Sequence, residues 1–228
     1  MSDAARAARI AHALRYPFDP PGRSYLFRDG TMQPLDAFDP AGRHAVVASG
    51  SNGSPDRLRE KFGDTATIPV TFGHLHGLVP VFAARITSYG SVPATLAPIP
   101  GRRAGVHITW LTDAQIEVMH VTEAVGRGYG WYRLDGFALD HEPWPQPAEM
   151  FAYIALHGAL APGGALLPLE DVSQHEAQGH VQRAHGNDGH LHDFVDRNLT
   201  DRDYRAGANE SAARLAVEVA HPGLVRLI

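Results

Sequence analysis

Two short stretches of this sequence carry residue types that could do chemistry. The first, Ser49-Gly50-Ser51-Asn52-Gly53, separates the apolar run HAVVA from a charged run that starts at Ser54-Pro55. Small residues between a buried strand and a helix N-terminus expose backbone N–H groups at the positive end of the helix dipole. We therefore expect a cradle of N–H groups that holds an anionic or carbonyl group. The alternative is a plain turn with an ordinary helix cap.

The second stretch is LTDAQIEVMHVTEA, residues 111–124. Thr112 and Gln115 have the spacing of a capping box, which predicts a helix over about 113–123. At roughly 100° per residue, Ile116, Met119 and Glu123 fall on one stripe of this helix. A second apolar stripe predicts that the helix lies between two apolar surfaces; its members are Ala114, Val118 and Val121.

The position of Glu123 on an apolar stripe has a chemical consequence. A carboxylate in apolar surroundings is costly when ionised, and the C-terminal end of a helix adds negative potential, so we expect a raised pKa for Glu123. A glutamate with a pKa shifted toward neutrality suits general acid–base catalysis. The alternative is that Glu123 frays from the last turn, or pairs with Arg127 or Arg133.

Composition limits the classes of function. The chain has 228 residues, of which 44% are hydrophobic and 20% charged, so it can form a sizeable core. Its net charge of −5 argues against nucleic acid or an anionic membrane as the main partner. It has no cysteine, no apolar signal segment, and no apolar run approaching the ~20 residues of a membrane span. We expect a cytoplasmic protein whose partner is a small molecule.

The elements that must position these residues form three parts. Residues 1–43 are expected to be an N-terminal extension with a helix and a hairpin at Asp29-Gly30. Residues 44–168 contain short runs rich in Val, Ile, Thr and Phe, interrupted by one helix. Residues 169–228 are polar and predict a helical segment packed on the rest, ending in a helix over 209–221. Many strands without strict βαβ alternation indicate an α+β fold with a curled mixed sheet.

The order and spacing of these motifs resemble the gamma-glutamylcyclotransferase-like family. Members of that family carry a Tyr-Gly-Ser-Asn loop after the first strand, and Gly50-Ser51-Asn52 matches it here. Tyr89-Gly90 with the following strands matches the middle of the pattern, and the helix that ends at Glu123 matches the family's Leu-rich helix. The resemblance covers about residues 44–157. This chain departs from the pattern at Ser49, where the family has tyrosine, and at Ala124, where it has glycine.

The resemblance implies a mixed β-barrel with packed helices and a cavity floored by the small-residue loop. It implies that Glu123 is catalytic and that residues 49–53, namely Ser49, Gly50, Ser51, Asn52 and Gly53, bind the substrate. Tyr132, on the strand after the helix, is expected to line the same pocket. The implied reaction is attack of the α-amine of a γ-glutamyl amide on its own amide carbonyl, which releases 5-oxoproline and an amine. Such a reaction requires no metal or organic cofactor.

Two other classes of function stay open at the level of sequence. The departures at Ser49 and Ala124 suit a non-catalytic binding or interaction module on the same fold. The 14 histidines make a metal hydrolase the second alternative, although His175, His180, His185 and His190 are spaced by five and do not share a helix face. The histidine pairs at 74/76 and 190/192 come without an obvious third ligand. The sequence indicates neither the leaving amine nor the oligomeric state.

Overall fold

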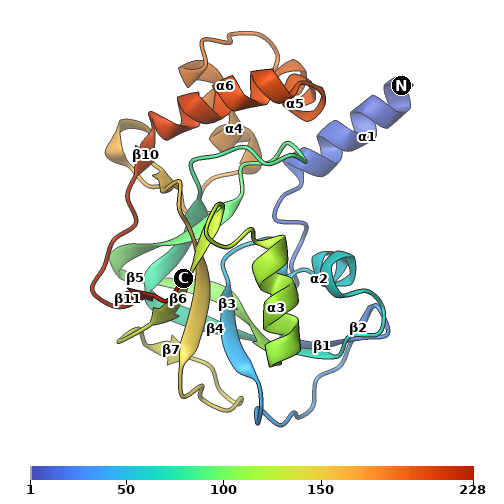
Figure 1. The fold of residues 1–228 in the computed structure, drawn as a ribbon, viewed down its shortest axis with the longest axis vertical. Coiled ribbons are helices and arrows are strands. Elements are labelled where there is room, and N and C mark those ends of the chain that lie inside the picture. The colour runs from blue at the N-terminus through green and yellow to red at the C-terminus, as the bar shows by residue number, and fades with distance from the viewer. Residues whose placement is uncertain (1) are drawn as a thin grey trace.

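A large mixed sheet forms the centre of the computed structural model, which describes residues 2–228 (Figure 1). Within this range its strands run in the order β11-β6-β8-β3-β5-β4-β1-β2, and β7 also pairs with β4. Neighbouring strands are antiparallel except β3 and β8, which are parallel. The bounds are β1 Tyr25–Arg28, β2 Thr31–Gln33, β3 His44–Ala48, β4 Ile68–Phe82, β5 Ala94–Leu111, β6 Tyr129–Leu134, β7 Leu139–Asp140, β8 Met150–Ala155 and β11 Leu224–Arg226.

The sheet must curl, because a short connection joins strands that lie far apart in its order. Five Cα steps separate Leu134 in β6 from Leu139 in β7, and they span at most about 18 Å. In a flat sheet, five strand spacings would put these strands about 24 Å apart. Leu139 nevertheless pairs with Leu75 of β4. The α+β fold with a curled mixed sheet and packed helices is therefore confirmed.

The helices form two groups (Figure 1). Two of them, α2 and α3, pack beside the sheet near the small-residue loop, while the other four gather at one end of the molecule. The bounds are α1 Asp3–Leu14, α2 Pro55–Phe62, α3 Asp113–Thr122, α4 Gln174–Ala184, α5 Leu191–Thr200 and α6 Arg202–Ala213. Short 3₁₀ turns cover Ser51–Gly53 and Pro162–Gly164, and β9 (Ala159–Leu160) pairs with β10 (Ala216–Val217) in a small second sheet.

Three apolar clusters hold these layers together. Leu96, Ile108 and Trp110 belong to the cluster within the curl of the sheet. Leu58 of α2 and Met119 of α3 belong to a second cluster, which fixes both helices against the sheet. A third lies under α4–α6 and includes Phe82, Val181 and Phe194. Each fully buried side chain of this size contributes about 1.5–3 kcal/mol, so the elements around the small-residue loop are firmly held.

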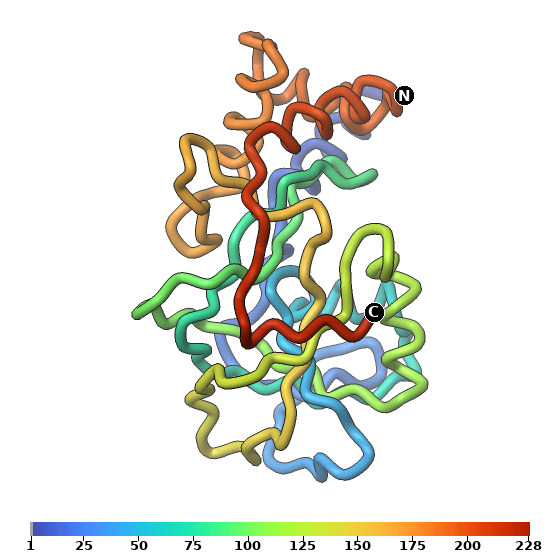
Figure 2. Tube along the Cα trace, turned by 60° about the vertical axis from the view of Figure 1, so that its left-hand side comes forward, coloured from blue at the N-terminus to red at the C-terminus, as the bar shows by residue number. Residues whose placement is uncertain are grey.

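Two predicted elements differ from the structure. The helix expected over 209–221 ends at Ala213, and the chain then runs back along the molecule to the sheet, where β11 pairs with β6 (Figure 2). Leu215 and Ala216 pack against the cluster under α4–α6, so packing against the body overrides helix propensity there. The second apolar stripe of α3 is exposed at Val121, which is 80% accessible, so only the Ile116 and Met119 side of that helix is covered.

The division into three parts remains a prediction, but the expected extension and tail both join the central sheet. The hairpin β1-β2 forms at Asp29-Gly30 as predicted, and β1 pairs with β4. The last strand, β11, pairs with β6 at Tyr132 and Arg133. No helix among residues 2–228 is long and apolar enough to cross a membrane.

Candidate active site

The small-residue loop and the end of α3 face one cavity of about 200 Å³. The loop lies between β3 and α2, and Ser54-Pro55 starts α2 as the sequence predicts. The cavity is lined by Tyr16, Val47, Ser49, Gly50, Ser51, Asn52, Arg57, Lys61, Arg85, Thr87, Ser88, Tyr89, Pro93, Ala94, Thr122, Glu123, Ala124, Tyr129 and Tyr153. Its volume is below the ~300 Å³ typical of sites for drug-sized ligands, so it suits a molecule about the size of one amino acid.

Both glycines of the loop are required by close packing. A Cβ at Gly50 would lie 2.1 Å from the Tyr16 hydroxyl, and one at Gly53 would lie 2.6 Å from Nδ1 of His107. The hydroxyl of Tyr25 donates a hydrogen bond to the Gly53 carbonyl at 2.8 Å. The loop is therefore a rigid turn, and its conformation is fixed from both sides.

The loop offers a smaller cradle of N–H groups than the sequence predicts. The Gly53 N–H donates to the Gly50 carbonyl at 3.3 Å, and the Ser54 N–H donates to the Ser51 carbonyl at 2.9 Å, so both close the 3₁₀ turn. Burial raises the pKa of the neighbouring Tyr16 phenol, and the backbone N–H groups of Ala94 and Ser51 offset part of this rise. Asn52 contributes its side-chain amide to the site instead. The loop thus contributes the side-chain amide of Asn52 to the cavity as well as backbone N–H groups.

Glu123 lies at the point where α3 ends. The predicted capping box of Thr112 and Gln115 is present, the helix ends at Thr122, and the Glu123 N–H donates to the Met119 carbonyl at 2.9 Å. The carboxyl group is buried, with 13% of the side chain exposed. It has therefore not frayed into solvent, and it pairs with neither Arg127 nor Arg133.

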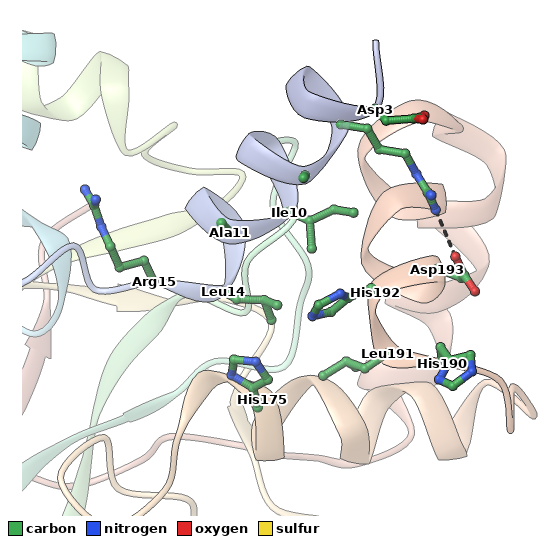
Figure 3. A pocket seen from close by; sticks show the side chains of 12 residues that line it. Asp3, Ile10, Ala11, Leu14, Arg15, His175, His190, Leu191, His192 and Asp193 are labelled. Carbon is green, nitrogen blue, oxygen red and sulfur yellow. Dashed lines mark hydrogen bonds and ion pairs between the residues drawn. The ribbon is translucent and has the colours of Figure 1, made fainter. Parts of the chain in front are cut away.

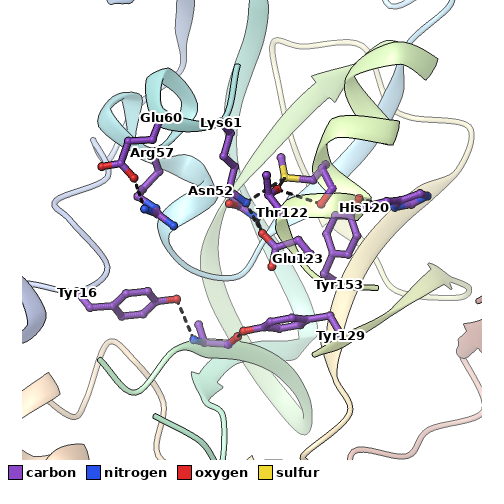
Figure 4. Close-up of polar contacts among 12 residues, drawn as sticks. Tyr16, Asn52, Arg57, Glu60, Lys61, His120, Thr122, Glu123, Tyr129 and Tyr153 are labelled. Carbon is purple, nitrogen blue, oxygen red and sulfur yellow. Dashed lines mark hydrogen bonds and ion pairs between the residues drawn. The ribbon is translucent and has the colours of Figure 1, made fainter. Parts of the chain in front are cut away.

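The two oxygens of the Glu123 carboxylate have different environments (Figure 4). Oε1 accepts a hydrogen bond from Nδ2 of Asn52 at 3.0 Å and a second from Nζ of Lys61, with which Glu123 forms an ion pair. Oε2 accepts no hydrogen bond from any residue that the structure describes. One oxygen is thus anchored by two donors from the loop and α2, and the other is available to a ligand.

The pKa of Glu123 is lowered, and the predicted rise is wrong. Burial by itself raises the pKa, as the apolar stripe suggested. The ammonium group of Lys61, the hydrogen bond from Asn52 and the charge of Arg57 together outweigh burial and lower it. Glu123 is accordingly an ionised carboxylate at neutral pH, ready to accept a proton.

Sequence reasoning did not identify Lys61 as part of the site. It is the only lysine in the chain. Its side chain is 6% exposed, and Nζ lies 3.3 Å from Sδ of Met119 as well as against Glu123. The chain has 19 arginines and a single lysine, which lies one turn after Arg57 on the helix that follows the loop. This exception in composition could have pointed to Lys61 as a site residue. The role of Lys61 beside Glu123, however, depends on the packing of α2 against α3, which the sequence does not show.

Four tyrosines surround the carboxylate, and one of them comes from the N-terminal extension. The Tyr16 hydroxyl accepts a hydrogen bond from the Ala94 N–H at 2.8 Å, and the Tyr129 hydroxyl donates to the Ala94 carbonyl at 2.9 Å. The Tyr153 hydroxyl lies 2.9 Å from Nδ1 of His120. The fourth is Tyr89. Burial raises the pKa of all four, so they are neutral phenols that shape the cavity and offer hydrogen bonds.

Two arginines complete the polar lining. Arg57 of α2 pairs with Glu60, and its guanidinium lies over the rings of Phe18 and Tyr89, at 5.6 and 5.2 Å. The Nε atom of Arg57 is buried without a hydrogen-bond partner. Arg85, in the connection after β4, is half-buried. Its guanidinium makes no ion pair or hydrogen bond with any residue in the described range.

The remaining predicted site residues lie in different places. Ser49, Gly50, Ser51 and Asn52 line the cavity with Glu123. Gly53 belongs to the loop but packs against His107. Tyr132 lines another cavity, with neighbours that include Ile154 and Arg226. Its position on β6 separates it from Glu123, whereas Tyr129, three residues earlier, reaches the site.

The histidines of the tail gather elsewhere. His175, His190 and His192 line an open cavity of about 1010 Å³ beside α1, together with Leu14 and Leu191 (Figure 3). Across residues 2–228, no group of three or more His, Cys, Asp or Glu side chains is placed to hold a metal ion. Arg6 and Asp193 form an ion pair across this groove at 2.8 Å.

Comparison with known proteins finds a likeness in overall architecture only. No family model matches the chain, and no curated protein matches it. A solved structure described as "Gamma-glutamyl cyclotransferase" is similar, with a TM-score of 0.42 and 11% sequence identity, over 80% of this chain and 93% of that chain. At that level of similarity, the function has to be argued from the contacts of the site.

Proposed function

We propose that the protein is a γ-glutamyl cyclotransferase-type enzyme, which releases 5-oxoproline and an amine from a γ-glutamyl amide. One observation carries the proposal. An ionised carboxylate is fixed through one oxygen by Lys61 and Asn52, and its other oxygen is unpaired at a cavity of amino-acid size. Such an arrangement suits a base that takes a proton from a small substrate and returns it later.

The reaction follows from this geometry. Oε2 of Glu123 accepts a proton from the α-ammonium group of the substrate. The free amine then attacks the γ-carbonyl carbon, forming the ring C–N bond of a five-membered lactam. Glu123 passes this proton to the departing nitrogen as the original amide C–N bond breaks. It then takes the second proton from the ring nitrogen and gives it to the released amine, so a neutral lactam and an ammonium ion leave and no external reactant is consumed. Ring closure is intramolecular, so an enzyme that holds the substrate in its folded conformer lowers the entropic part of the barrier.

Charge that develops on the carbonyl oxygen needs hydrogen-bond donors. The loop at Gly50 and Asn52 and the phenol of Tyr16 lie on the cavity wall, whereas the Tyr129 hydroxyl already donates to the Ala94 carbonyl. The neutral phenol of Tyr16 is a suitable donor, because burial raises its pKa and its hydroxyl accepts rather than donates the hydrogen bond with the Ala94 N–H. Donors held in fixed positions stabilise a developing oxyanion without reorganisation.

A screen of γ-glutamyl amides for release of 5-oxoproline tests this function. We expect the wild type to convert at least one of them, and Glu123→Gln to reduce kcat by at least about 1,000-fold. Glu117→Gln is the matched control, because Glu117 lies exposed on the same helix and the substitution makes the same change. Binding of 5-oxoproline to the Glu123→Gln protein shows that the cavity is intact.

The alternative class, a binding module without turnover, predicts a different pattern in the same screen. The wild type would bind 5-oxoproline or a γ-glutamyl compound, and no amide would release product. A fully active Glu123→Gln variant would refute the assignment of the base.

A further inference from the structure

The cavity at Glu123 carries one positive charge that the protein does not neutralise. Its charged lining consists of Arg57, Lys61, Arg85 and Glu123. Lys61 pairs with Glu123, and Arg57 pairs with Glu60. Arg85 alone of these cations forms no ion pair within residues 2–228. A half-buried guanidinium without a partner is costly unless a ligand supplies the anion.

Arg85 is held in place from both sides along the chain. The N–H of Ala84 donates to the Gly158 carbonyl at 3.0 Å. The N–H of Ile86 donates to Oδ1 of Asn209 at 2.6 Å, and Nδ2 of Asn209 lies 3.3 Å from the Ile86 carbonyl. The backbone on which the guanidinium is mounted is therefore fixed before a ligand arrives, which reduces the entropy lost on binding.

Arg85 lies beside the end of α3. A Cβ built at Gly128 would be 3.1 Å from Nη1 of Arg85 and 3.0 Å from the backbone carbonyl oxygen of Glu123. The guanidinium and the main chain of Glu123 thus lie within contact distance of the same point, and glycine at 128 leaves room for both. Because Arg85 and Glu123 line the same cavity, a ligand there can present a cationic group to Glu123 and an anionic group to Arg85.

The small-residue loop cannot supply the whole of an anion site. The N–H groups of Gly53 and Ser54 both close the 3₁₀ turn and are not available to a ligand. We propose that Arg85 binds the α-carboxylate of the substrate while Glu123 takes the proton from its α-ammonium group. This inference rests on the proposed function and names its substrate class: γ-glutamyl compounds with a free α-carboxylate. Compounds whose α-carboxyl group is esterified or amidated are rejected, whereas the leaving amine does not contact Arg85.

The test compares a γ-glutamyl amide with its α-methyl ester, which keeps the α-amine and loses the negative charge. We expect Arg85→Gln to lower kcat/KM for the acid about 10- to 100-fold, mainly through KM, and to leave kcat/KM for the ester unchanged. Arg85→Lys recovers part of the loss, because it restores the charge without the bidentate geometry. Arg127→Gln, an exposed neighbour with the same change in charge, is the control.

A binding measurement separates this inference from the proposed function. L-Glutamate and 5-oxoproline are titrated into the wild type, Arg85→Gln and Arg127→Gln, with calorimetry as the readout. Weaker binding to Arg85→Gln alone supports the carboxylate site even if no amide is ever turned over. Equal binding to all three, or equal discrimination between acid and ester in the wild type and Arg85→Gln, overturns it even if cyclisation is established.

Discussion

At the scale of single residues, the site depends on the pair formed by Glu123 and Lys61. The position of Glu123 was readable from the sequence, because Ile116 and Met119 mark the buried stripe of its helix. The ionisation state of Glu123 could not be predicted from the sequence, because it depends on Lys61, which lies on another helix. Burial and a buried cation act on the carboxylate in opposite directions. Only the packing of α2 on α3 shows that the cation prevails.

The pair predicts how activity depends on pH. Because Lys61 and Asn52 lower the pKa of Glu123, the base stays ionised well into acid, and the acid limb of the kcat/KM profile lies below the ordinary glutamate value. Lys61→Met removes the opposing charge, so the pKa of Glu123 rises and the acid limb moves to higher pH. Steady-state profiles of both proteins measure the shift. Superimposed profiles would contradict this role of Lys61.

The same pair predicts an effect on stability. Glu123 has a lower pKa in the folded protein than in the unfolded chain, so its contribution is present above the unfolded pKa and is lost as pH falls through the folded one. Both partners are buried, and removing one leaves an uncompensated charge that costs about 3–5 kcal/mol. Lys61→Met should show this loss at neutral pH.

The double variant Lys61→Met/Glu123→Gln is the control for that prediction. It removes both charges, so we expect it to recover most of the loss in denaturant titrations. Additive losses in the double variant would mean that the two side chains do not interact as the structure places them.

At the scale of elements, the site is made where the N-terminal extension meets the β3–α2 loop. The loop and the end of α3 were both predictable, because each has a local signature: small residues before Ser54-Pro55, and a capping box. Tyr16 was not predictable, because its role comes from packing across long sequence separations. A Cβ on Gly50 would overlap its hydroxyl, and Ala94 donates to it.

Tyr16→Phe tests this contact. The substitution leaves the Ala94 N–H buried without its acceptor, which costs about 1–3 kcal/mol. We expect a loss of stability in that range in denaturant titrations. Tyr132→Phe is the control, since it makes the same change on β6, outside this cavity. Equal stability of the two variants would show that the Tyr16 hydroxyl is not buried against the loop.

At the scale of the whole molecule, the helical tail supports the segment that carries Arg85. The α+β class and the curled sheet followed from many short strands and one capped helix. The role of the helical tail could not be predicted from the sequence, because the tail supports another segment and carries no motif of its own. Asn209 of α6 bonds both backbone groups of Ile86, and Gln178 of α4 donates to the Gly90 carbonyl. The tail therefore fixes one wall of the cavity.

The variant Asn209→Ala tests whether the tail affects substrate binding through the position of Arg85 without affecting the chemical step. Loss of the two bonds to Ile86 frees the neighbouring Arg85, so we expect KM to rise several-fold, with kcat changed less than twofold. In an Arg85→Gln background the same change should add nothing to KM. Asn187→Ala removes an amide from the tail that contacts Tyr204 instead, and should leave KM unaltered. An equal rise in KM for both asparagine variants would contradict the role given to Asn209.

The most direct test of the central claim is the identity of the product formed in water enriched in ¹⁸O. A γ-glutamyl amide that the wild type consumes is incubated with the enzyme in this water, and the masses of the products are measured by mass spectrometry. Attack by the substrate's own amine predicts 5-oxoproline without ¹⁸O, equimolar with the released amine, and none with Glu123→Gln. Glutamate carrying ¹⁸O would show that water is the nucleophile, and would contradict the account.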